Sequence, residues 1–376
     1  MRLGLQKKLF VTAVALGFAL VIPVSGIAGD TIKFGVAGAQ SGDLASYGLP
    51  TVKAAELVVA QFNAKGGING KKIELLIEDD VCKPEVATNT ATKLVTDGVD
   101  VVLGHICSGA TKAALPIYKE AGVVVMSPSA TNPGLTQSGD YPNFFRSIAS
   151  DDSQAKTEVD FAINVIGAKK IAVIHDKGDY GKGLAEFAKK FIEESGKAEV
   201  VLFEGVTPGA VDYTAIVQKI KRKGSDTVIF GGYHPEASKI VSMMKKKRID
   251  ITFISDDGVK DDTFIKVAGK NAEGVYASGP QDNSKNPLSA AAIDAHKKAY
   301  NEDPGAFYEN AYSAALALLN AVEKAGSTDM AAVVKALQTE KVDTPVGTIH
   351  FDEKGDAVGV GFAMYQVKDG QYVEVK

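Results

Sequence analysis

The sequence has little of what most catalytic and metal sites require. It contains two cysteines and five scattered histidines, with no Gly-x-Ser-x-Gly elbow and no His-Glu-x-x-His helix. No Gly-Lys-Ser or Gly-Lys-Thr is present, and Gly35, Gly38 and Gly42 do not have the Gly-x-Gly-x-x-Gly spacing of dinucleotide sites. Because no nucleophile can be paired with a base, we predict that the chain is not an enzyme and uses no cofactor or metal ion.

An excess of positive charge is also missing. The formal net charge is −4 at pH 7, and the first 28 residues contribute Arg2, Lys7 and Lys8 but no acidic residue. Without them the chain would carry a charge of −7. A mildly acidic chain is a poor ligand for nucleic acid, so no nucleic-acid partner is predicted.

Long apolar runs are absent except at the N-terminus. There a positive segment precedes about 16 apolar residues and the small-residue site Gly26-Ile27-Ala28, which is typical of an export signal cut after Ala28. The alternative is a membrane anchor, but this run is shorter than the roughly 20 residues that a spanning helix needs. We therefore predict that residues 1–28 are a signal peptide, and that the mature protein works in the periplasm without inserting into the membrane.

The two cysteines, Cys82 and Cys107, both lie in the exported part. An oxidising compartment favours their pairing, so we expect one disulfide. The alternative is a metal site, because His105 stands two residues before Cys107, but no third or fourth ligand falls at a zinc-like spacing.

Length and periodicity predict an α/β protein of two domains. The exported part, about 350 residues, is more than one hydrophobic core usually supports. Short β-branched runs alternate with stretches of helical period, as in parallel sheets covered by helices. The predicted strands are 31–38, 72–78, 99–103 and 123–126 in a first block, 170–174, 199–203, 227–230, 252–254 and 275–277 in a second, and 348–351, 362–367 and 372–375 in the tail.

The predicted helices fall between these strands. They span 49–64, a stretch opened by Pro84, 111–121, 153–166, 183–194, 213–223 and 236–246. Two further helical patterns, 287–300 and 306–325, follow the second block with no strand between them. That arrangement is expected if the chain returns to the first domain.

Small hydroxyl residues follow two strands of the first block. One segment, Gly104-His105-Ile106-Cys107-Ser108-Gly109, leads into a helix, and the other is Ser127-Pro128-Ser129-Ala130-Thr131. Ligands of open parallel sheets bind at the carboxyl ends of strands, and free N–H groups at a helix start suit a carboxylate. The alternative for any single Ser or Thr is ordinary helix capping.

Several segments resemble the periplasmic leucine/isoleucine/valine-binding proteins of ABC importers. The resemblance runs in order from about residue 31 to the C-terminus. It is carried by Asn63-Ala64-Lys65-Gly66-Gly67-Ile68-Asn69-Gly70, Gly104 to Ser108, His175-Asp176-Lys177 with Tyr180-Gly181, Gly231-Gly232-Tyr233-His234-Pro235-Glu236, and Phe351-Asp352-Glu353-Lys354-Gly355-Asp356.

The resemblance implies the type I periplasmic binding protein fold, in which two Rossmann-like lobes with parallel sheets are joined by a three-crossing hinge. The crossings are expected near residues 147–149, 278–280 and 357–361. The N-terminal lobe would contain residues 30–148 plus 279–358, and the C-terminal lobe residues 149–278 plus 359–376. The family also has a disulfide that matches Cys82 with Cys107.

The resemblance also implies a set of ligand contacts. Ser108 and Thr131 would hold the α-carboxylate of an amino acid, and the Ser129 carbonyl and the Thr131 hydroxyl would help to hold its ammonium. Tyr233 would contact the ligand from the second lobe. The family supplies the counter-charge from a Glu in Gly-Pro-Glu-Gly. Here the segment is Ser255-Asp256-Asp257-Gly258, so Asp257 takes that role with a shorter side chain.

The apolar wall of such a site is expected from Tyr47, Ile106, Tyr180 and Tyr308. Tyr47 and Tyr180 are predicted to lie in loops that close over the ligand. Glu309 stands where the family tends to carry a bulky apolar residue. It shares a helical face with Ser313, Leu316 and Asn320, so we predict that it is solvated.

The sequence thus predicts an exported, monomeric binding protein that captures an aliphatic or branched-chain amino acid such as leucine and presents it to the permease subunits of an ABC importer. Three alternatives remain open. The same fold could bind an amide, a short carboxylic acid or an aromatic acid; the chain could be the ligand-binding subunit of a sensor; or it could be an exported hydrolase.

Overall fold

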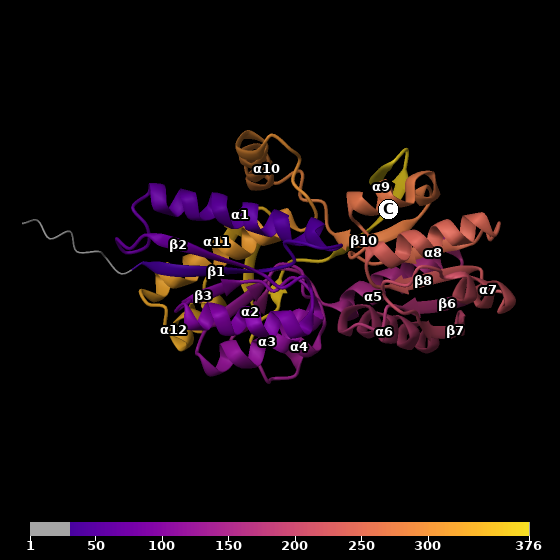
Figure 1. The fold of residues 1–376 in the computed structure, drawn as a ribbon, viewed down its shortest axis with the longest axis horizontal. Coiled ribbons are helices and arrows are strands. Elements are labelled where there is room, and N and C mark those ends of the chain that lie inside the picture. The colour runs from indigo at the N-terminus through magenta and orange to yellow at the C-terminus, as the bar shows by residue number, and fades with distance from the viewer. Residues whose placement is uncertain (1–30, 376) are drawn as a thin grey trace, which may run out of the picture.

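The computed structural model describes residues 31–375, which form two α/β lobes lying side by side (Figure 1). The predicted signal peptide, residues 1–28, lies outside the described residues. Each lobe is built on a sheet of mainly parallel strands with helices on both faces. The predicted α/β class with two parallel sheets is therefore confirmed.

The first lobe contains a five-stranded sheet in the order β2-β1-β3-β4-β5, and all its pairs are parallel. Apolar side chains alternate between its two faces, where they meet α1, α11 and α12 on one side and α2 and α3 on the other. These elements are β1 (Ile32–Gly38), α1 (Ala45–Ala64), β2 (Ile73–Asp79), α2 (Pro84–Thr96), β3 (Val101–Leu103), α3 (Ser108–Glu120), β4 (Val124–Ser127), α4 (Gly134–Gln137), β5 (Phe144–Arg146), α11 (Tyr308–Ala325) and α12 (Met330–Thr339).

The second lobe contains a seven-stranded sheet in the order β15-β14-β10-β9-β8-β6-β7. Its last two strands in sequence, β14 and β15, run antiparallel to their neighbours and close one edge. Its elements are α5 (Asp151–Phe161), η1 (Ala162–Ile166), β6 (Lys170–His175), α6 (Asp179–Ser195), β7 (Glu199–Gly205), α7 (Thr214–Arg222), β8 (Thr227–Gly231), α8 (His234–Lys246), β9 (Thr252–Ser255), α9 (Asp262–Ala268), η2 (Gly269–Ala272), β10 (Tyr276–Pro280), β14 (Phe362–Lys368) and β15 (Gln371–Val375).

The chain passes between the two sheets three times, after β5, after β10 and before β14. The long return after β10 begins with α10 (Pro287–Tyr300), which lies at the outer side of α1 in Figure 1 and packs on the first lobe through Ala292. It continues into α11 and α12 on the first sheet and into a small sheet of β11 (Val342–Thr344), β12 (Gly347–Phe351) and β13 (Ala357–Val358). Each lobe is therefore completed by residues distant in sequence.

Several elements differ from the sequence-based expectation. Helix α12 and the short strands β5, β11 and β13 were not predicted. The helix expected at 153–166 starts at Asp151 and gives way to a π-helical turn, η1. Strands of two or three residues carry too little alternation to be recognised, and neighbouring elements decide where a helix ends.

Within residues 31–375, no helix is both long enough and apolar enough to cross a bilayer.

Candidate functional site

A small cavity lies between the lobes, where loops from the carboxyl ends of strands of both sheets meet. Its volume is about 10 Å³, room for about one water molecule, because the lobes are in contact around it. The first lobe contributes the start of α1 and the loops after β3 and β4, and the second contributes the start of α6 and the loops after β8 and β9. The residues that line it are Tyr47, Ile106, Cys107, Ser129, Tyr180, Tyr233, Asp257, Gly258 and Phe307.

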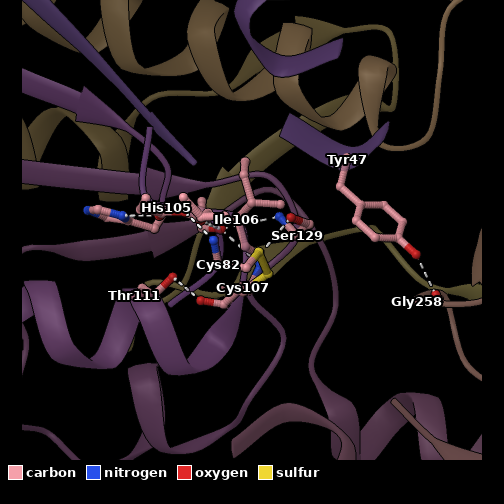
Figure 2. The surroundings of a disulfide bond; sticks show 12 residues. Tyr47, Cys82, His105, Ile106, Cys107, Thr111, Ser129 and Gly258 are labelled. Atoms are coloured by element: carbon pink, nitrogen blue, oxygen red, sulfur yellow. Dashed lines mark hydrogen bonds and ion pairs between the residues drawn. A yellow bond between two sulfur atoms is a disulfide. The ribbon is translucent and has the colours of Figure 1, made fainter. Parts of the chain in front are cut away.

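The two first-lobe loops are tied to each other beside this cavity (Figure 2). The Ser129 hydroxyl donates to the Ile106 carbonyl at 2.9 Å, and the Ser127 hydroxyl donates to the His105 carbonyl at 2.5 Å. Ser108 is the first residue of α3, and its hydroxyl accepts from the Asn132 N–H at 3.2 Å. The first turn of α3 thus points N–H groups without intrahelical partners toward the cleft, as a carboxylate would require.

The loop after β3 is braced by a disulfide and by a buried hydrogen-bond network. Cys82 and Cys107 are bonded, which confirms the predicted disulfide. His105 Nδ1 lies 2.5 Å from Asp80 Oδ2, and its Nε2 lies 3.1 Å from the Tyr118 hydroxyl. Both ring nitrogens of His105 are therefore engaged in this network. The described residues contain no group of three or more side chains suited to hold a metal ion.

Removing the disulfide should lower stability without removing the fold. The bond joins residues 25 apart, and closing a loop of that size restricts the unfolded chain by about 3 kcal/mol. We expect the Cys82→Ser/Cys107→Ser double variant to lose about that much free energy of unfolding in urea titrations. The parent protein reduced with a thiol serves as the control, and a parent unaffected by reduction would contradict the expectation.

Two hydrogen-bond acceptors of the first lobe and the first crossing are left without well-aligned partners. Thr131 and Asp151 are fully buried, and the Asp151 N–H donates to the Thr131 carbonyl at 2.9 Å. Among residues 31–375, neither Thr131 Oγ1 nor either carboxylate oxygen of Asp151 finds a hydrogen-bond partner of good geometry, although the Thr131 hydroxyl lies close enough to Asp151 to act on its carboxyl. Burial raises the pKa of Asp151 to about 8, against the lowering effect of the Thr131 hydroxyl. This arrangement is suited to a buried donor such as an ammonium group.

Asp257 provides a third acceptor, from the second lobe. It follows β9 and is 2% exposed. Its Oδ1 accepts from the Tyr180 hydroxyl, and its Oδ2 has no partner in the described chain. Burial raises the pKa of Asp257 to about 6, and the Tyr180 hydroxyl opposes that rise. Asp257 also raises the pKa of Asp151 through its charge, so the two carboxylates act on one another across the cleft.

Direct contacts hold the lobes together around the cavity. The Tyr47 hydroxyl donates to the Gly258 carbonyl at 2.6 Å, as Figure 2 shows, and lies 2.5 Å from His234 Nδ1. Tyr47 and Tyr180 lie in the first turns of α1 and α6, not in the loops expected from the sequence.

Inside the second lobe, Gly181 and Gly231 pack backbone to backbone. A Cβ on Gly181 would lie 2.3 Å from the Gly231 carbonyl oxygen. This close approach brings the first turn of α6, with Tyr180, to the start of α8, with Tyr233, and the two ring centres lie 5.3 Å apart.

The aromatic wall includes Phe307, where the sequence analysis named Tyr308. Phe307 lines the cavity, and its ring lies 5.9 Å from that of Tyr47. Tyr308 instead begins α11 and points into the first-lobe core, where its hydroxyl donates to the Ala292 carbonyl. Phe307 precedes the helix with a φ of 59°, a left-handed conformation that costs a non-glycine residue about 1–2 kcal/mol. The turn therefore decides which of the two rings faces the cavity.

Glu309 is only partly exposed, where its helical face predicted a solvated position. It lines a second, larger cavity between the lobes, and its Oε1 accepts from the Ser289 hydroxyl at 2.5 Å. Burial raises the pKa of Glu309 above its usual range. Helical periodicity could not predict this environment, because part of the cavity wall around Glu309 comes from the other lobe.

Asp151 is the residue of this site that the sequence analysis missed. It opens α5, where an acidic residue is ordinary. The sequence did contain a pattern that pointed to it, because Gln154 and Glu158 follow Asp151 at helical spacing. The structure buries all three side chains fully. Gln154 Nε2 donates to the Ser278 hydroxyl, which donates to Glu158 Oε1, each at 2.7 Å. A polar stripe on the buried face of a helix indicates a site or a junction between segments.

Comparison with known proteins shows which family the chain belongs to. Residues 31–371 match the model of the periplasmic binding proteins. The chain belongs to that family. It is 39% identical over 380 residues, covering all of both chains, to a leucine-, isoleucine-, valine-, threonine- and alanine-binding protein of Pseudomonas aeruginosa. It is 35% identical to the Leu/Ile/Val-binding protein of Escherichia coli, covering 89% of this chain and 90% of that protein.

A solved structure with a similar sequence agrees with this assignment. It is the branched-chain amino acid transporter substrate binding protein LivJ of Streptococcus pneumoniae, in complex with isoleucine. The TM-score is 0.82 at 32% identity, and the match covers 92% of this chain and all of that one. Membership of the family supports the type I periplasmic binding protein fold predicted from the sequence.

Proposed function

We propose that this periplasmic binding protein captures aliphatic and branched-chain L-amino acids between its lobes, at the small cavity, which widens when the lobes move apart to admit the ligand. The zwitterion's carboxylate binds at the start of α3, near Ser108. Its ammonium binds between Thr131, Asp151 and Asp257, with the Ser129 carbonyl nearby. Its side chain packs against Tyr47, Ile106, Tyr233 and Phe307, and Tyr180 holds Asp257 in place.

One observation carries the proposal. Buried acceptors without partners come from the first lobe (Thr131), the first crossing (Asp151) and the second lobe (Asp257). Asp257 lines a cavity with an aromatic and aliphatic wall, and its charge acts on Asp151. Buried polar groups are almost always paired, so such a set is suited to a ligand with several N–H donors. An ammonium offers three donors and the charge that the Asp257 carboxylate needs, while Asp151, with its pKa raised to about 8, accepts as a neutral carboxyl. The names of the relatives support the choice of an aliphatic side chain.

The same proposal covers partners and compartment. The chain is exported to the periplasm, works as a monomer without catalysing a reaction, and delivers its ligand to the permease of an ABC importer. Residues 30–148 with 279–358 and residues 149–278 with 359–376 act as two bodies that close on the ligand.

Isothermal calorimetry with the mature protein tests this function. We expect leucine, isoleucine and valine to bind, and short amides and benzoate to give no heat at the same concentrations. Binding of an aromatic acid without any amino acid would replace the proposed ligand class, and binding of none of these ligands would remove it.

Amino-acid affinity should fall in acid. The ammonium needs Asp257 as a carboxylate, and the pKa of that group is raised to about 6 by burial. Asp151, whose pKa is raised to about 8, stays protonated over the range tested and does not add to the dependence. A bound cation favours the ionised form, so ligand and proton compete, and affinity is full above about pH 6 and decreases as pH falls through it. We expect a loss of up to about tenfold for each pH unit below 6, measured by calorimetry from pH 4.5 to 7.5.

The Asp257→Asn variant is the control for this dependence, because it keeps the shape of the side chain but has no group to titrate. Its weaker affinity should vary little over the same range. An equally steep acid loss in this variant would assign the dependence to another group.

A further inference from the structure

The larger cavity begins where the amino-acid cavity ends. It has a volume of about 1180 Å³, and it shares Asp257 and Phe307 with the smaller cavity. Residues of both lobes line it, and Phe307 stands at the boundary between the two spaces. A ligand side chain longer than that of leucine, directed past the Phe307 ring, would therefore enter this larger cavity.

A lysine side chain is built into its wall. Lys260 follows β9, and its aliphatic chain lies against the backbone of Gly279, near the point where the chain passes between the lobes for the second time. A Cβ at Gly279 would lie 2.1 Å from Lys260 Cδ, so only glycine leaves this path open. The Lys260 ammonium lies 4.2 Å from the centre of the Tyr365 ring. The path and the ring contact together fix where this positive charge sits.

The Lys260 charge has no direct acidic partner. Within the described part of the chain, no carboxylate lies within 4.0 Å of its ammonium, and it makes no hydrogen bond. Burial lowers the pKa of Lys260, and the surrounding carboxylates oppose that effect, Glu309 of the first lobe most strongly and then Asp262, Asp282 and Asp257. Lys260 is thus a cation whose charge interacts with several carboxylates around the cavity but forms an ion pair with none of them.

We propose that Lys260 and Glu309, facing the same cavity from opposite lobes, form a subsite that selects the charge of the ligand's side chain and rejects cationic amino acids. The inference rests on the proposed function, since it concerns the side chain of a bound amino acid. A cationic side chain that passes Phe307 meets the Lys260 charge in a partly buried space, where like charges repel strongly. Removing Lys260 leaves an acidic wall that attracts the same cation.

The test compares leucine, ornithine and glutamate on the mature protein and two variants by calorimetry. We expect Lys260→Met to bind ornithine at least tenfold more tightly than the parent, while its affinity for leucine changes less than threefold. Glu309→Gln should shift selectivity the other way and improve glutamate relative to ornithine. Lys266→Met is the matched control, because Lys266 lines the same cavity but is exposed, and it should leave ornithine binding unchanged.

The outcomes separate the two proposals. If the parent does not bind leucine, the proposed function fails. If leucine binds to the parent and to Lys260→Met alike and ornithine affinity does not rise, the charge subsite is overturned. If Lys260→Met loses leucine binding through misfolding, seen as a lower melting temperature, the Glu309→Gln result decides: unchanged selectivity between glutamate and ornithine also overturns the subsite.

Discussion

We expect the Asp257→Ala variant to bind its amino acid at least ten times more weakly than the parent protein. The substitution removes the carboxylate that the second lobe supplies and leaves the ligand ammonium partly uncompensated in a closed cleft. Truncating one partner of a buried charge pair costs about 2–5 kcal/mol, and 1.4 kcal/mol is a factor of ten. Calorimetry with leucine measures the loss directly.

Two variants separate charge from shape at this position. Asp257→Glu restores the side chain found in the family and should keep binding close to that of the parent. Asp257→Asn keeps the size of the side chain but not its charge, and it should resemble the alanine variant. Unchanged affinity in Asp257→Ala would rule out its role as the counter-charge, and Asp151 would then have to neutralise the ammonium alone.

The second large effect is expected at Arg146, which is fully buried. Its Nε lies 2.5 Å from Asp356 Oδ1, its Nη2 donates to the Thr136 hydroxyl, and its Nη1 donates to the Ala130 and Asn132 carbonyls. It thus ties the polar turn before β13 to the loop that carries Thr131. Breaking such a pair leaves buried groups unsatisfied, so Arg146→Met should lower the free energy of unfolding by about 3–5 kcal/mol.

Urea titration of the ligand-free protein measures this loss. Lys354→Met, in the same turn but exposed, provides the matched control and should change stability by less than about 0.5 kcal/mol. We also expect weaker leucine binding in Arg146→Met, because the carbonyls it holds flank Thr131. A stability loss below about 1 kcal/mol would show that the Arg146 contacts are replaceable.

Much of the fold could be predicted from local patterns. Strands such as β1 and β8 are apolar runs buried on both faces, and α6 and α8 have a clear helical period, so the parallel sheets follow from the sequence. Short elements such as β5 are defined by pairing with a neighbour, and the sequence does not contain that information in one place. The turn before β13 was recognised as a family motif, but its role as the partner of Arg146 required the structure.

The candidate site was predicted in part. Ser129 was found because it follows a strand, and Asp257 through the family resemblance; the structure brings both to the cavity. Asp151 was missed because its helix-opening position is ordinary, and Tyr308 was named where Phe307 faces the cavity. A difference of one residue at the start of a helix turns a side chain by about 100° and is decided by tertiary contacts.

The amino-acid sequence by itself determined the alternation of buried strands and amphipathic helices, and hence which loops lie at the carboxyl ends of the sheets. It could do so because burial imposes periods that are visible over ten or fifteen neighbouring residues. The tertiary structure alone decided that Thr131, Asp151 and Asp257 supply partnerless acceptors at one cleft, and that Lys260 and Glu309 face one cavity. Those residues come from separate segments, and their desolvation, which sets their charge states, exists only once the lobes are packed together.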